Sequence, residues 1–474
     1  MTDDDLCYLS AFDAIALFKA RKLSPVELLN AQIARSEIAE SVINAFSETY
    51  FDDALEQARK AEARYAKTDG RPRALEGITV AVKNEAQIKG QRTTYGSLIY
   101  KDNIATETDP WVGRLMRAGA IVHARTTAPE FACDWVCHSR LEGITRNPWN
   151  PAYTSGASSG GSGASLAIGA TTLATGSDIV GSIRLPAAHC GVVGYKPPYG
   201  RNPNVTPQNL DFYSHVGPLT RSVVDCAMMQ NVTAGPHPHD LASLRSKIHI
   251  PLELEGIEGW KIAWSMDLGF FAVAPEIRER VLVALDALRD AGAIVEEVDV
   301  PWTEKVNRAA RHHINHLSCQ ALVRLNQDHA DLMCKNTLFY ADRAKETSAE
   351  EFLQALETVD EMYQFMGPLM ERYHGFVCPT ITTGEIPADL WPWDSVKVDR
   401  KIVATDYGWN LTHPFNMLSR LPAIAVPAGI AANGLPAGIQ IAARNYDDVR
   451  VFRIARALER VQPWLDCPER RPRL

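Results

Sequence analysis

Hydrophobic and polar positions along the chain follow two periods, one typical of strands and one typical of helices. Residues 78–83 read Ile-Thr-Val-Ala-Val-Lys, with branched side chains on alternate positions, which predicts a strand ending in a lysine. Asp109-Pro110 predicts a helix start, Gly119 closes that helix, and residues 120–123 resume a strand. The same order returns later, with a helix predicted at 275–291 and strands at 294–300, 376–378, 423–426 and 438–442. This alternation predicts an α/β fold, a single large domain over residues 1–474 with a mixed central β-sheet covered by helices on both faces.

Helix start signals place a mainly helical segment ahead of the first predicted strand. Ser24-Pro25-Val26-Glu27 has the arrangement of a capping box with proline at the first helical position. Ser10 and Asp13 form a similar start signal, and Ser348 with Glu351 caps another predicted long helix. We therefore expect a helical N-terminal segment over about residues 1–75.

Composition and charge narrow the class of protein. Hydrophobic residues make up 46% and charged residues 22% of the chain, which is typical of a folded globular protein. Acidic residues exceed basic ones by 57 to 49, and no block of lysine or arginine marks a nucleic-acid footprint. No stretch has the ~18 consecutive apolar residues of a membrane span. The nine cysteines are odd in number and lack framework spacing, as in a protein with reduced thiols. We expect a cytoplasmic protein that binds neither nucleic acid nor membrane.

A glycine- and serine-rich segment at 155–163 has three interpretations. Its composition fits a flexible linker, although the small-residue run at 164–175 and the Asn-Pro-Trp-Asn-Pro sequence at 147–151 are not linker-like. A phosphate-binding loop requires a lysine that is missing here. Gly156-Ala157-Ser158-Ser159-Gly160 matches the G-x-S-x-G nucleophile elbow, but that elbow follows an apolar strand, and residues 146–154 contain two prolines and predict none.

A second unusual segment, Gly-Ser-Asp-Ile-Val-Gly-Ser-Ile-Arg-Leu-Pro, lies at 176–186. A serine after a turn of small residues can be held where neighbouring backbone N–H groups converge, as an oxyanion hole requires. A tight turn with a buried Asp178–Arg184 pair explains the same residues. The residues alone leave both interpretations open.

Taken in order, these segments resemble the amidase signature family of serine hydrolases. The resemblance rests on a series of matches across nearly the whole chain, at 80–84, 93–97, 146–151, 155–163, 178–186, 190–197, 217–222, 422–429 and 434–440. It implies the amidase signature fold.

The resemblance also implies a catalytic triad of Lys83, Ser158 and Ser182. Ser182 would be the nucleophile, Ser158, preceded by a cis peptide bond, would bridge, and Lys83 would accept and return the proton. The implied oxyanion hole consists of the backbone N–H groups of Ile179, Val180, Gly181 and Ser182. Supporting positions fall on Asp178, Arg184 and Ser159, and the acyl pocket falls near Phe131, Ala132 and Cys133.

The expected reaction is hydrolysis of an amide C–N bond through a covalent acyl-enzyme. A serine hydroxyl needs a base, and lysine is one only when uncharged; a free lysine amine has a pKa of about 10.4, so burial must favour the neutral form. Candidate substrates are aryl or alkyl acylamides, oligoamides and carbamates (urethanes), with no cofactor or metal, acting as a monomer or homodimer. The alternatives are an A-type subunit of a tRNA-dependent amidotransferase and a non-catalytic binding protein.

Three positions depart from the family pattern: Val180 and Ala157 replace its usual glycines, and Asn84 replaces its usual aspartate. Because of these changes, the substrate preferences of other family members do not carry over to this chain. The 391–393 sequence Trp-Pro-Trp is expected in a loop that either covers the mouth of the site or packs ordinarily.

Other candidate groups are expected to be non-catalytic. Cys133-x-x-x-Cys137-His138 lacks a second pair at zinc-site spacing, and reduced thiols are expected. The histidines at 312, 313 and 316 lack the glutamate of H-E-x-x-H, and a solvated or channel-facing helix is expected. His189 is expected to be a structural neighbour of the nucleophile.

Overall fold

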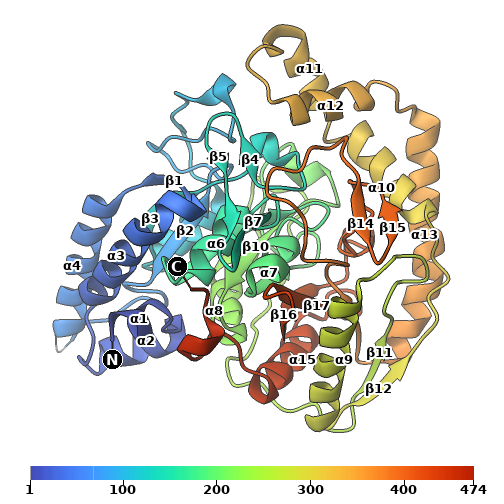
Figure 1. The fold of residues 1–474 in the computed structure, drawn as a ribbon. Coiled ribbons are helices and arrows are strands. Elements are labelled where there is room, and N and C mark those ends of the chain that lie inside the picture. Colours follow the sequence, from blue (N-terminus) through green and yellow to red (C-terminus); the bar gives the residue numbers. More distant parts are fainter. Residues whose placement is uncertain (1, 68, 474) are drawn as a thin grey trace.

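An eleven-stranded mixed sheet runs through the molecule (Figure 1), in a computed structural model that describes residues 2–67 and 69–473. In spatial order its strands are β1 (Phe46–Thr49), β3 (Ile121–Thr126), β2 (Thr79–Lys83), β8 (Leu173–Asp178), β10 (His215–Thr220), β9 (Val193–Lys196), β16 (Ala423–Ile430), β17 (Pro436–Ala442), β13 (Gly375–Pro379), β11 (Lys261–Trp264) and β12 (Ile294–Glu297). Strand β2 is parallel to β3 and β8, β11 is parallel to β12 and β13, and the other pairs are antiparallel. The predicted single α/β domain with a mixed sheet is confirmed. Met1, Thr68 and Leu474 lie outside the described residues.

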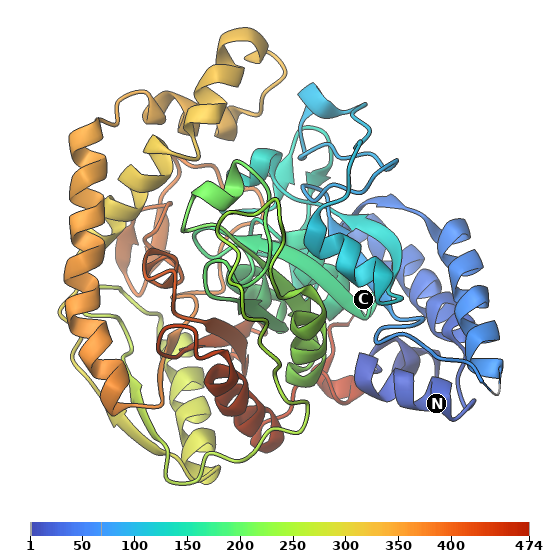
Figure 2. The ribbon, with the colours of Figure 1, turned by 180° about the vertical axis from the view of Figure 1, so that it is seen from behind.

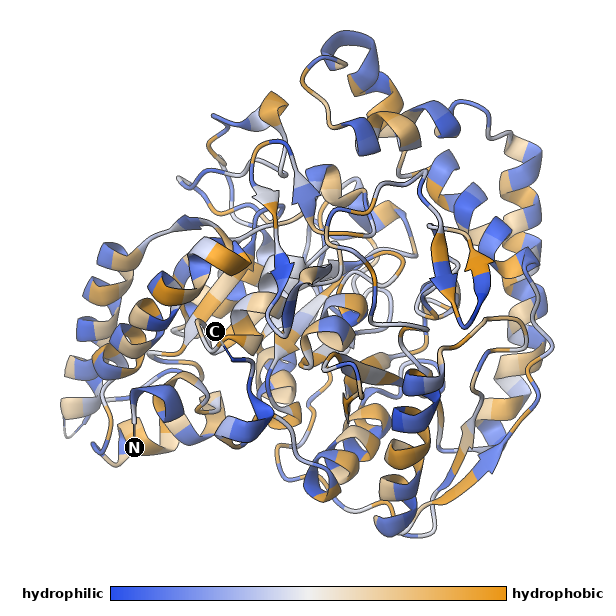
Figure 3. Cartoon of the chain, in the orientation of Figure 1, coloured by the Kyte–Doolittle hydropathy of each residue, from blue (hydrophilic) through white to orange (hydrophobic). Residues whose placement is uncertain are grey.

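Helices cover both faces of this sheet. They are α1 (Asp3–Cys7), α2 (Ala11–Lys19), α3 (Pro25–Ile43), α4 (Phe51–Ala66), α5 (Pro110–Arg117), α6 (Gly160–Ala167), α7 (Arg184–Cys190), α8 (Val223–Thr233), α9 (Pro275–Asp290), α10 (Lys305–His316), α11 (Gln320–His329), α12 (Lys335–Ala344), α13 (Ala349–Arg372), α14 (Pro414–Met417) and α15 (Asp448–Val461). Helices α6 and α7 lie in front of the sheet in Figure 1, and α8 lies in front of it in the reverse view of Figure 2. Hydrophobic residues concentrate on the central strands and on one side of the surrounding helices (Figure 3). None of the helices among the described residues is long and apolar enough to cross a membrane.

Local signals in the sequence explain where several helices begin. The Ser24 hydroxyl accepts a hydrogen bond from the N–H of Val26 at 3.0 Å, and the Glu27 carboxylate accepts one from the N–H of Ser24 at 2.8 Å. This is the reciprocal pattern of a capping box, and α3 begins where it was predicted. Ser348 caps α13 in the same way.

Three segments differ from the prediction. The N-terminal segment is not wholly helical, because β1 leaves it to pair with β3 at the edge of the sheet. Residues 146–154 form a hairpin of β6 (Arg146–Asn147) and β7 (Asn150–Thr154), outside the main sheet, where no strand was predicted. The loop expected around residues 391–393 leads into an unpredicted hairpin, in which β14 (Val396–Val398) pairs with β15 (Lys401–Val403). A further hairpin joins β4 (His138–Ser139) and β5 (Gly143–Ile144).

The glycine-rich segment is a buried helix and not a linker. Every residue of α6 is buried. A Cβ atom on Gly161 would lie 2.4 Å from the carbonyl oxygen of Ala45 and 2.6 Å from the backbone nitrogen of Thr127. Only glycine permits this approach, so the helix packs directly against neighbouring backbone, and the loop that precedes it is held in place.

Candidate active site

Lys83 ends β2 at the carboxyl edge of the parallel part of the sheet, where α/β folds commonly place their sites. Its side chain is 1% exposed. The backbone N–H of Lys83 donates to Thr175 Oγ1 of the neighbouring strand β8 at 2.9 Å. The side-chain amine lies 2.7 Å from Ser158 Oγ. Two of the three predicted catalytic side chains are therefore in direct contact, 75 residues apart in sequence.

The loop before α6 brings Ser158 to Lys83 and to the backbone of Ser182. The peptide bond between Ala157 and Ser158 is cis. The N–H of Ser159 donates to the carbonyl oxygen of Ser182 at 3.1 Å, which joins the two serine-bearing loops. Ser182 is 8% exposed, and its hydroxyl makes no hydrogen bond within the described chain.

Two further groups contact the amine of Lys83, and the sequence analysis did not select either of them. Ser177 Oγ lies 2.9 Å from Lys83 Nζ, and Glu85 Oε1 lies 3.1 Å from it. The pairing of β8 with β2, in which Ala81 is opposite Ala174, brings Ser177 to the amine, and the sequence alone does not show this pairing. The lysine amine thus has two hydroxyl partners and one carboxylate.

The segment after β8 is folded around the carboxylate of Asp178. Its Oδ1 accepts the N–H of Gly181 at 2.8 Å, and its Oδ2 accepts the N–H of Ile183 at 3.2 Å. The Gly181 amide, one of four predicted oxyanion donors, is therefore already bonded. Among the residues described, the backbone amides of the other three have no acceptor: Ile179, Val180 and Ser182.

Arg184 holds Asp178 in a fully buried network. Both side chains are 0% exposed, and the Arg184 guanidinium contacts Asp178 at 3.0 Å through two nitrogens. The same guanidinium donates to the side chains of Asn416 and Gln440 at 2.6 and 2.7 Å. Burial alone would raise the pKa of Asp178, but the charge and hydrogen bonds of Arg184, with Asn416, outweigh it and hold that pKa at about 2. The turn with a buried ion pair and the serine-bearing loop are thus one structure.

Thr412 closes the other side of this loop. Its hydroxyl donates to the carbonyl oxygen of Val180 at 2.6 Å. Gly181 has a φ of 129°, and a Cβ atom there would lie 2.0 Å from Thr412 Oγ1 and 2.7 Å from Thr412 Cβ. The position accepts only glycine, because both the backbone conformation and the space exclude a side chain.

Gly181→Ala is expected to lower turnover about 100-fold or more, because the loop must move away from Thr412 and its amides lose their alignment. Steady-state hydrolysis of an acyl anilide measures this. Gly434→Ala is the matched control, since Gly434 also has a positive φ, 79°, but no atom lies within 4 Å of the added methyl group. The control should lose about 1–2 kcal/mol of stability and keep its activity. Equal activity in the two variants would contradict the proposed geometry.

The predicted pocket residues lie on the loop between β3 and β4. Phe131 and Ala132 both have positive φ, 54° and 57°, and Phe131, Ala132 and Cys133 are partly exposed. Phe131 contacts the ring of Tyr100 edge-on, with centroids 6.0 Å apart. Their assignment to the acyl pocket stays a prediction.

Five of the histidines are buried, His123, His189, His215, His313 and His413. His313 was expected on a solvated or channel-facing helix side, but it is fully buried, stacked on Tyr213 with centroids 3.6 Å apart and bonded to Asp211 at 2.8 Å. His189 is buried against Trp409, and burial lowers its pKa to about 3. Its ring nitrogens have no hydrogen-bond partner in the described chain, so the structure offers no histidine relay through it.

The two tryptophans of the 391–393 sequence stack on each other, with ring centroids 5.1 Å apart. Trp391 contacts His138 and Trp393 contacts Phe339 of α12, and Trp393 is 52% exposed. The loop therefore joins α12 to the β4–β5 hairpin. Cys133, Cys137 and the other seven cysteines, all of them described, are free thiols.

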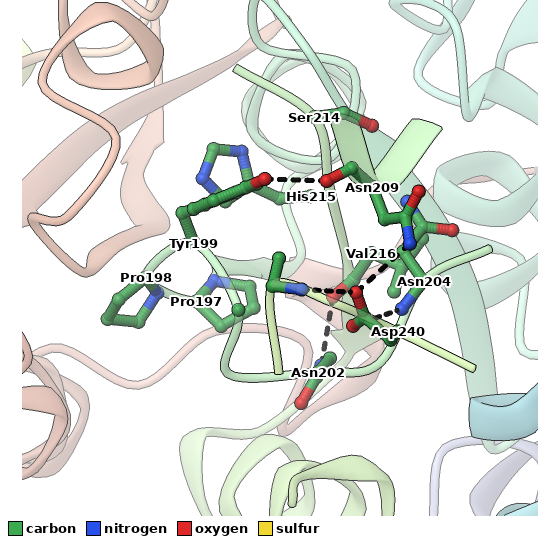
Figure 4. Close-up of a pocket in the computed structure, with 12 residues that line it drawn as sticks. Pro197, Pro198, Tyr199, Asn202, Asn204, Asn209, Ser214, His215, Val216 and Asp240 are labelled. Carbon is green, nitrogen blue, oxygen red and sulfur yellow. Dashed lines mark hydrogen bonds between the residues drawn. The ribbon is translucent and has the colours of Figure 1, made fainter. Parts of the chain in front are cut away.

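A separate small hollow lies beside β10 (Figure 4). Its polar groups bond to one another: the Asp240 carboxylate accepts from Asn209 at 3.2 Å, and the Tyr199 hydroxyl donates to the Asn209 carbonyl oxygen at 2.6 Å. Its volume of about 10 Å³ has room for no more than one water molecule. None of the predicted catalytic residues lines it, so it is not the substrate site.

Comparison with known proteins identifies the family of this chain. The sequence profile of the Amidase family matches residues 27–452. An acylamidase from Rhodococcus erythropolis is 32% identical, with 98% of each chain covered. The A subunit of a glutamyl-tRNA(Gln) amidotransferase from Anaeromyxobacter sp. (strain K) is 31% identical, again with 98% of each chain covered. The crystal structure of a bacterial aryl acylamidase of the amidase signature enzymes superposes with a TM-score of 0.88 at 27% identity, covering 96% of this chain and 97% of that one.

The fold, the lysine–serine contact and these matches define an enzyme that hydrolyses amide-type C–N bonds. The match to the family covers nearly the whole chain and is not confined to a single motif. The chain belongs to the amidase signature family.

Proposed function

We propose that this amidase works through Lys83, Ser158 and Ser182, with Ser182 as the nucleophile. The observation that carries the proposal is the 2.7 Å contact between Lys83 Nζ and Ser158 Oγ, with the lysine side chain only 1% exposed. A buried amine bonded to a serine hydroxyl is placed to accept its proton. The main-chain hydrogen bond from Ser159 to Ser182 joins the two loops that carry the serines, which supports a proton path between them.

In the proposed reaction, Ser182 Oγ attacks the amide carbonyl carbon as its proton passes to Ser158 and the Ser158 proton passes to Lys83 Nζ. The carbonyl oxygen becomes an oxyanion that the amides of Ile179, Val180 and Ser182 stabilise. Lys83 then returns a proton through Ser158 to the leaving nitrogen, the C–N bond breaks, and an ester on Ser182 remains. Water attacks this ester by the same route, releasing the acid and restoring the serine.

We propose that the substrate is an amide, namely an N-aryl or N-alkyl acylamide or an oligoamide, or else a carbamate, in which the C–N bond also adjoins a carbonyl. Support comes from the acylamidase and aryl acylamidase relatives, whose names describe their own activities. Ile179 and Val180 of the loop after β8 are apolar and partly exposed, which suits an uncharged acyl group, and we propose that Phe131 lines the same pocket. The Val180 side chain, in place of glycine, narrows the space beside the proposed oxyanion position.

The alternative function, in a tRNA-dependent amidotransferase, rests on the amidotransferase relatives, which are 28–31% identical. A protein named as a subunit works within an assembly, whereas we propose an enzyme active on its own as a monomer or homodimer. We further propose a cytoplasmic location, supported by the odd number and scattered positions of its free thiols.

The test is to trap the acyl-enzyme. The purified chain alone, mixed with an acyl anilide and quenched with acid within milliseconds, should gain the mass of one acyl group. After proteolysis, that mass should lie on the peptide containing Ser182. A fluorophosphonate should label the same residue and abolish turnover. An acyl group on another residue, or turnover that requires the other chains of an amidotransferase, would overturn the proposal.

A further inference from the structure

Glu85 is the carboxylate that contacts the amine of Lys83. Its Oε1 lies 3.1 Å from Lys83 Nζ, and its side chain is 23% exposed, against 1% for the lysine. Within the described chain it is the one acidic side chain at ion-pair distance from the Lys83 amine. The other two contacts of this amine, Ser158 and Ser177, are neutral hydroxyls.

The turn after β2 fixes where this carboxylate points. The N–H of Ala86 donates to the carbonyl oxygen of Lys83 at 3.0 Å, and the N–H of Asn84 donates to the carbonyl oxygen of Thr126 at 3.0 Å. The buried guanidinium of Arg125 donates to the same Lys83 carbonyl oxygen at 3.2 Å. Glu85 therefore lies on a turn that is closed by its own backbone hydrogen bond and attached to β3 at Lys83 and Asn84, which pre-organises its contact with the lysine.

The proposed reaction creates a charge that needs a partner. When Lys83 takes the proton from Ser158, an ammonium forms at a side chain with 1% exposure, and an uncompensated buried charge is costly. A carboxylate at 3.1 Å stabilises that ammonium, as the aspartate of a Ser–His–Asp triad stabilises its imidazolium.

Other titratable groups around the amine do not supply this charge. Burial raises the pKa of the Cys137 thiol, which stays neutral. Burial raises the pKa of Asp109 to about 6, and that carboxylate bonds to the N–H of Gln87. Glu142, whose pKa burial also raises, lies against Asn84 and Thr94. Arg125, a cation, faces backbone oxygens, and the Tyr95 hydroxyl, whose pKa burial raises, bonds to Gln87.

We propose that Glu85 is a positioning residue of the catalytic machinery, which orients Lys83 and balances its charge after proton transfer. This inference rests on the proposed triad. It has two opposite consequences for a variant without the carboxylate. The lysine would become a weaker base and turnover on the pH plateau would fall. The neutral lysine would also survive to lower pH, so the acid limb of activity would move down.

The test compares pH profiles of kcat and kcat/KM for wild type, Glu85→Gln, Glu85→Asp and Glu142→Gln on one acyl anilide. Glu85→Gln should lower the plateau kcat about tenfold and move the acid limb down by about one pH unit. Glu85→Asp keeps the charge and should stay closer to wild type in both respects. Glu142→Gln removes a nearby carboxylate that does not touch the amine, and its limb should move less than that of Glu85→Gln.

An unchanged or upward-shifted acid limb in Glu85→Gln, in a protein that unfolds at the wild-type temperature, would overturn the inference. So would an equal shift in Glu142→Gln. Lys83→Ala separates this failure from failure of the triad. If Lys83→Ala abolishes turnover and fluorophosphonate labelling while Glu85→Gln changes nothing, only the role of Glu85 is wrong. If Lys83→Ala keeps its activity, the triad itself is wrong.

Discussion

Replacement of Ser182 by alanine is expected to reduce turnover of an acyl anilide by a factor of about 10⁵ or more, with the protein still folded. The Ser182 hydroxyl is the group proposed to form the acyl-enzyme. A water molecule in its place would not be held in position to attack the carbonyl carbon. The fold should tolerate the change, because this hydroxyl makes no hydrogen bond within the described chain. Initial rates and a thermal unfolding curve measure the two effects separately.

The matched control is Ser214→Ala, another serine with little exposure, 6%, which lines the small hollow of Figure 4 and not the catalytic loops. The turnover rate of this variant should stay within about twofold of wild type, because the substitution lies outside the proposed catalytic loops. Fluorophosphonate labelling should persist in the control and vanish in Ser182→Ala. Full activity in Ser182→Ala would exclude this residue as the nucleophile.

The strand that carries Lys83 was predictable, but the surroundings of its amine were not. Alternating branched residues mark β2, and the lysine at its end is visible in the sequence. Ser158 and Ser177 are 75 and 94 residues away, and only the pairing of β2 with β8 and the packing of α6 bring them together. Glu85 is closer to Lys83 in sequence, and side chains at i and i+2 share a face of a strand. The strand ends at Lys83 and a turn follows, so this rule does not apply to Glu85, and only the structure shows the contact.

Strand β10 shows why part of the sheet escaped prediction. It lies between β8 and β9 yet contains Gly217 and Pro218, residues typical of turns. The structure accommodates the proline because β9 pairs only with Leu219 and Thr220, so no bond to β9 is required at Pro218. The glycines of α6 left the linker interpretation open for a similar reason, since both close packing and flexibility use glycine.

The sequence marks the loop that we propose as the oxyanion hole, but which of its backbone amides are free depends on side-chain geometry. The Asp178 carboxylate accepts a hydrogen bond from the N–H of Gly181. Three backbone amides therefore remain as candidate oxyanion donors, where the resemblance implied four. The spacing of residues in the sequence does not predict which of these amides points to the Asp178 carboxylate. The loop is therefore only as well ordered as the Asp178–Arg184 pair that holds it.

Arg184→Met is accordingly expected to cost about 3–5 kcal/mol of unfolding free energy, and to abolish activity in the molecules that still fold. Removing the guanidinium leaves the Asp178 carboxylate buried without its counter-charge. The loss should appear as a lower urea midpoint at an unchanged slope. Arg289→Met is the control, because Arg289 pairs with Asp286 on the surface, with side chains 44% and 71% exposed, and should cost less than about 1 kcal/mol.

The pH dependence of this difference gives an independent check. The folded pKa of Asp178 is about 2, below its ordinary value of 3.8, so the pair stabilises the fold above about pH 4 and the contribution is lost as the pH falls towards 2. The gap between wild type and Arg184→Met should therefore narrow in acid, while the Arg289→Met gap stays small throughout. A gap that is constant with pH would mean that Arg184 stabilises the loop by packing rather than by charge, and equal losses in the two variants would remove the ion pair from the account of the site.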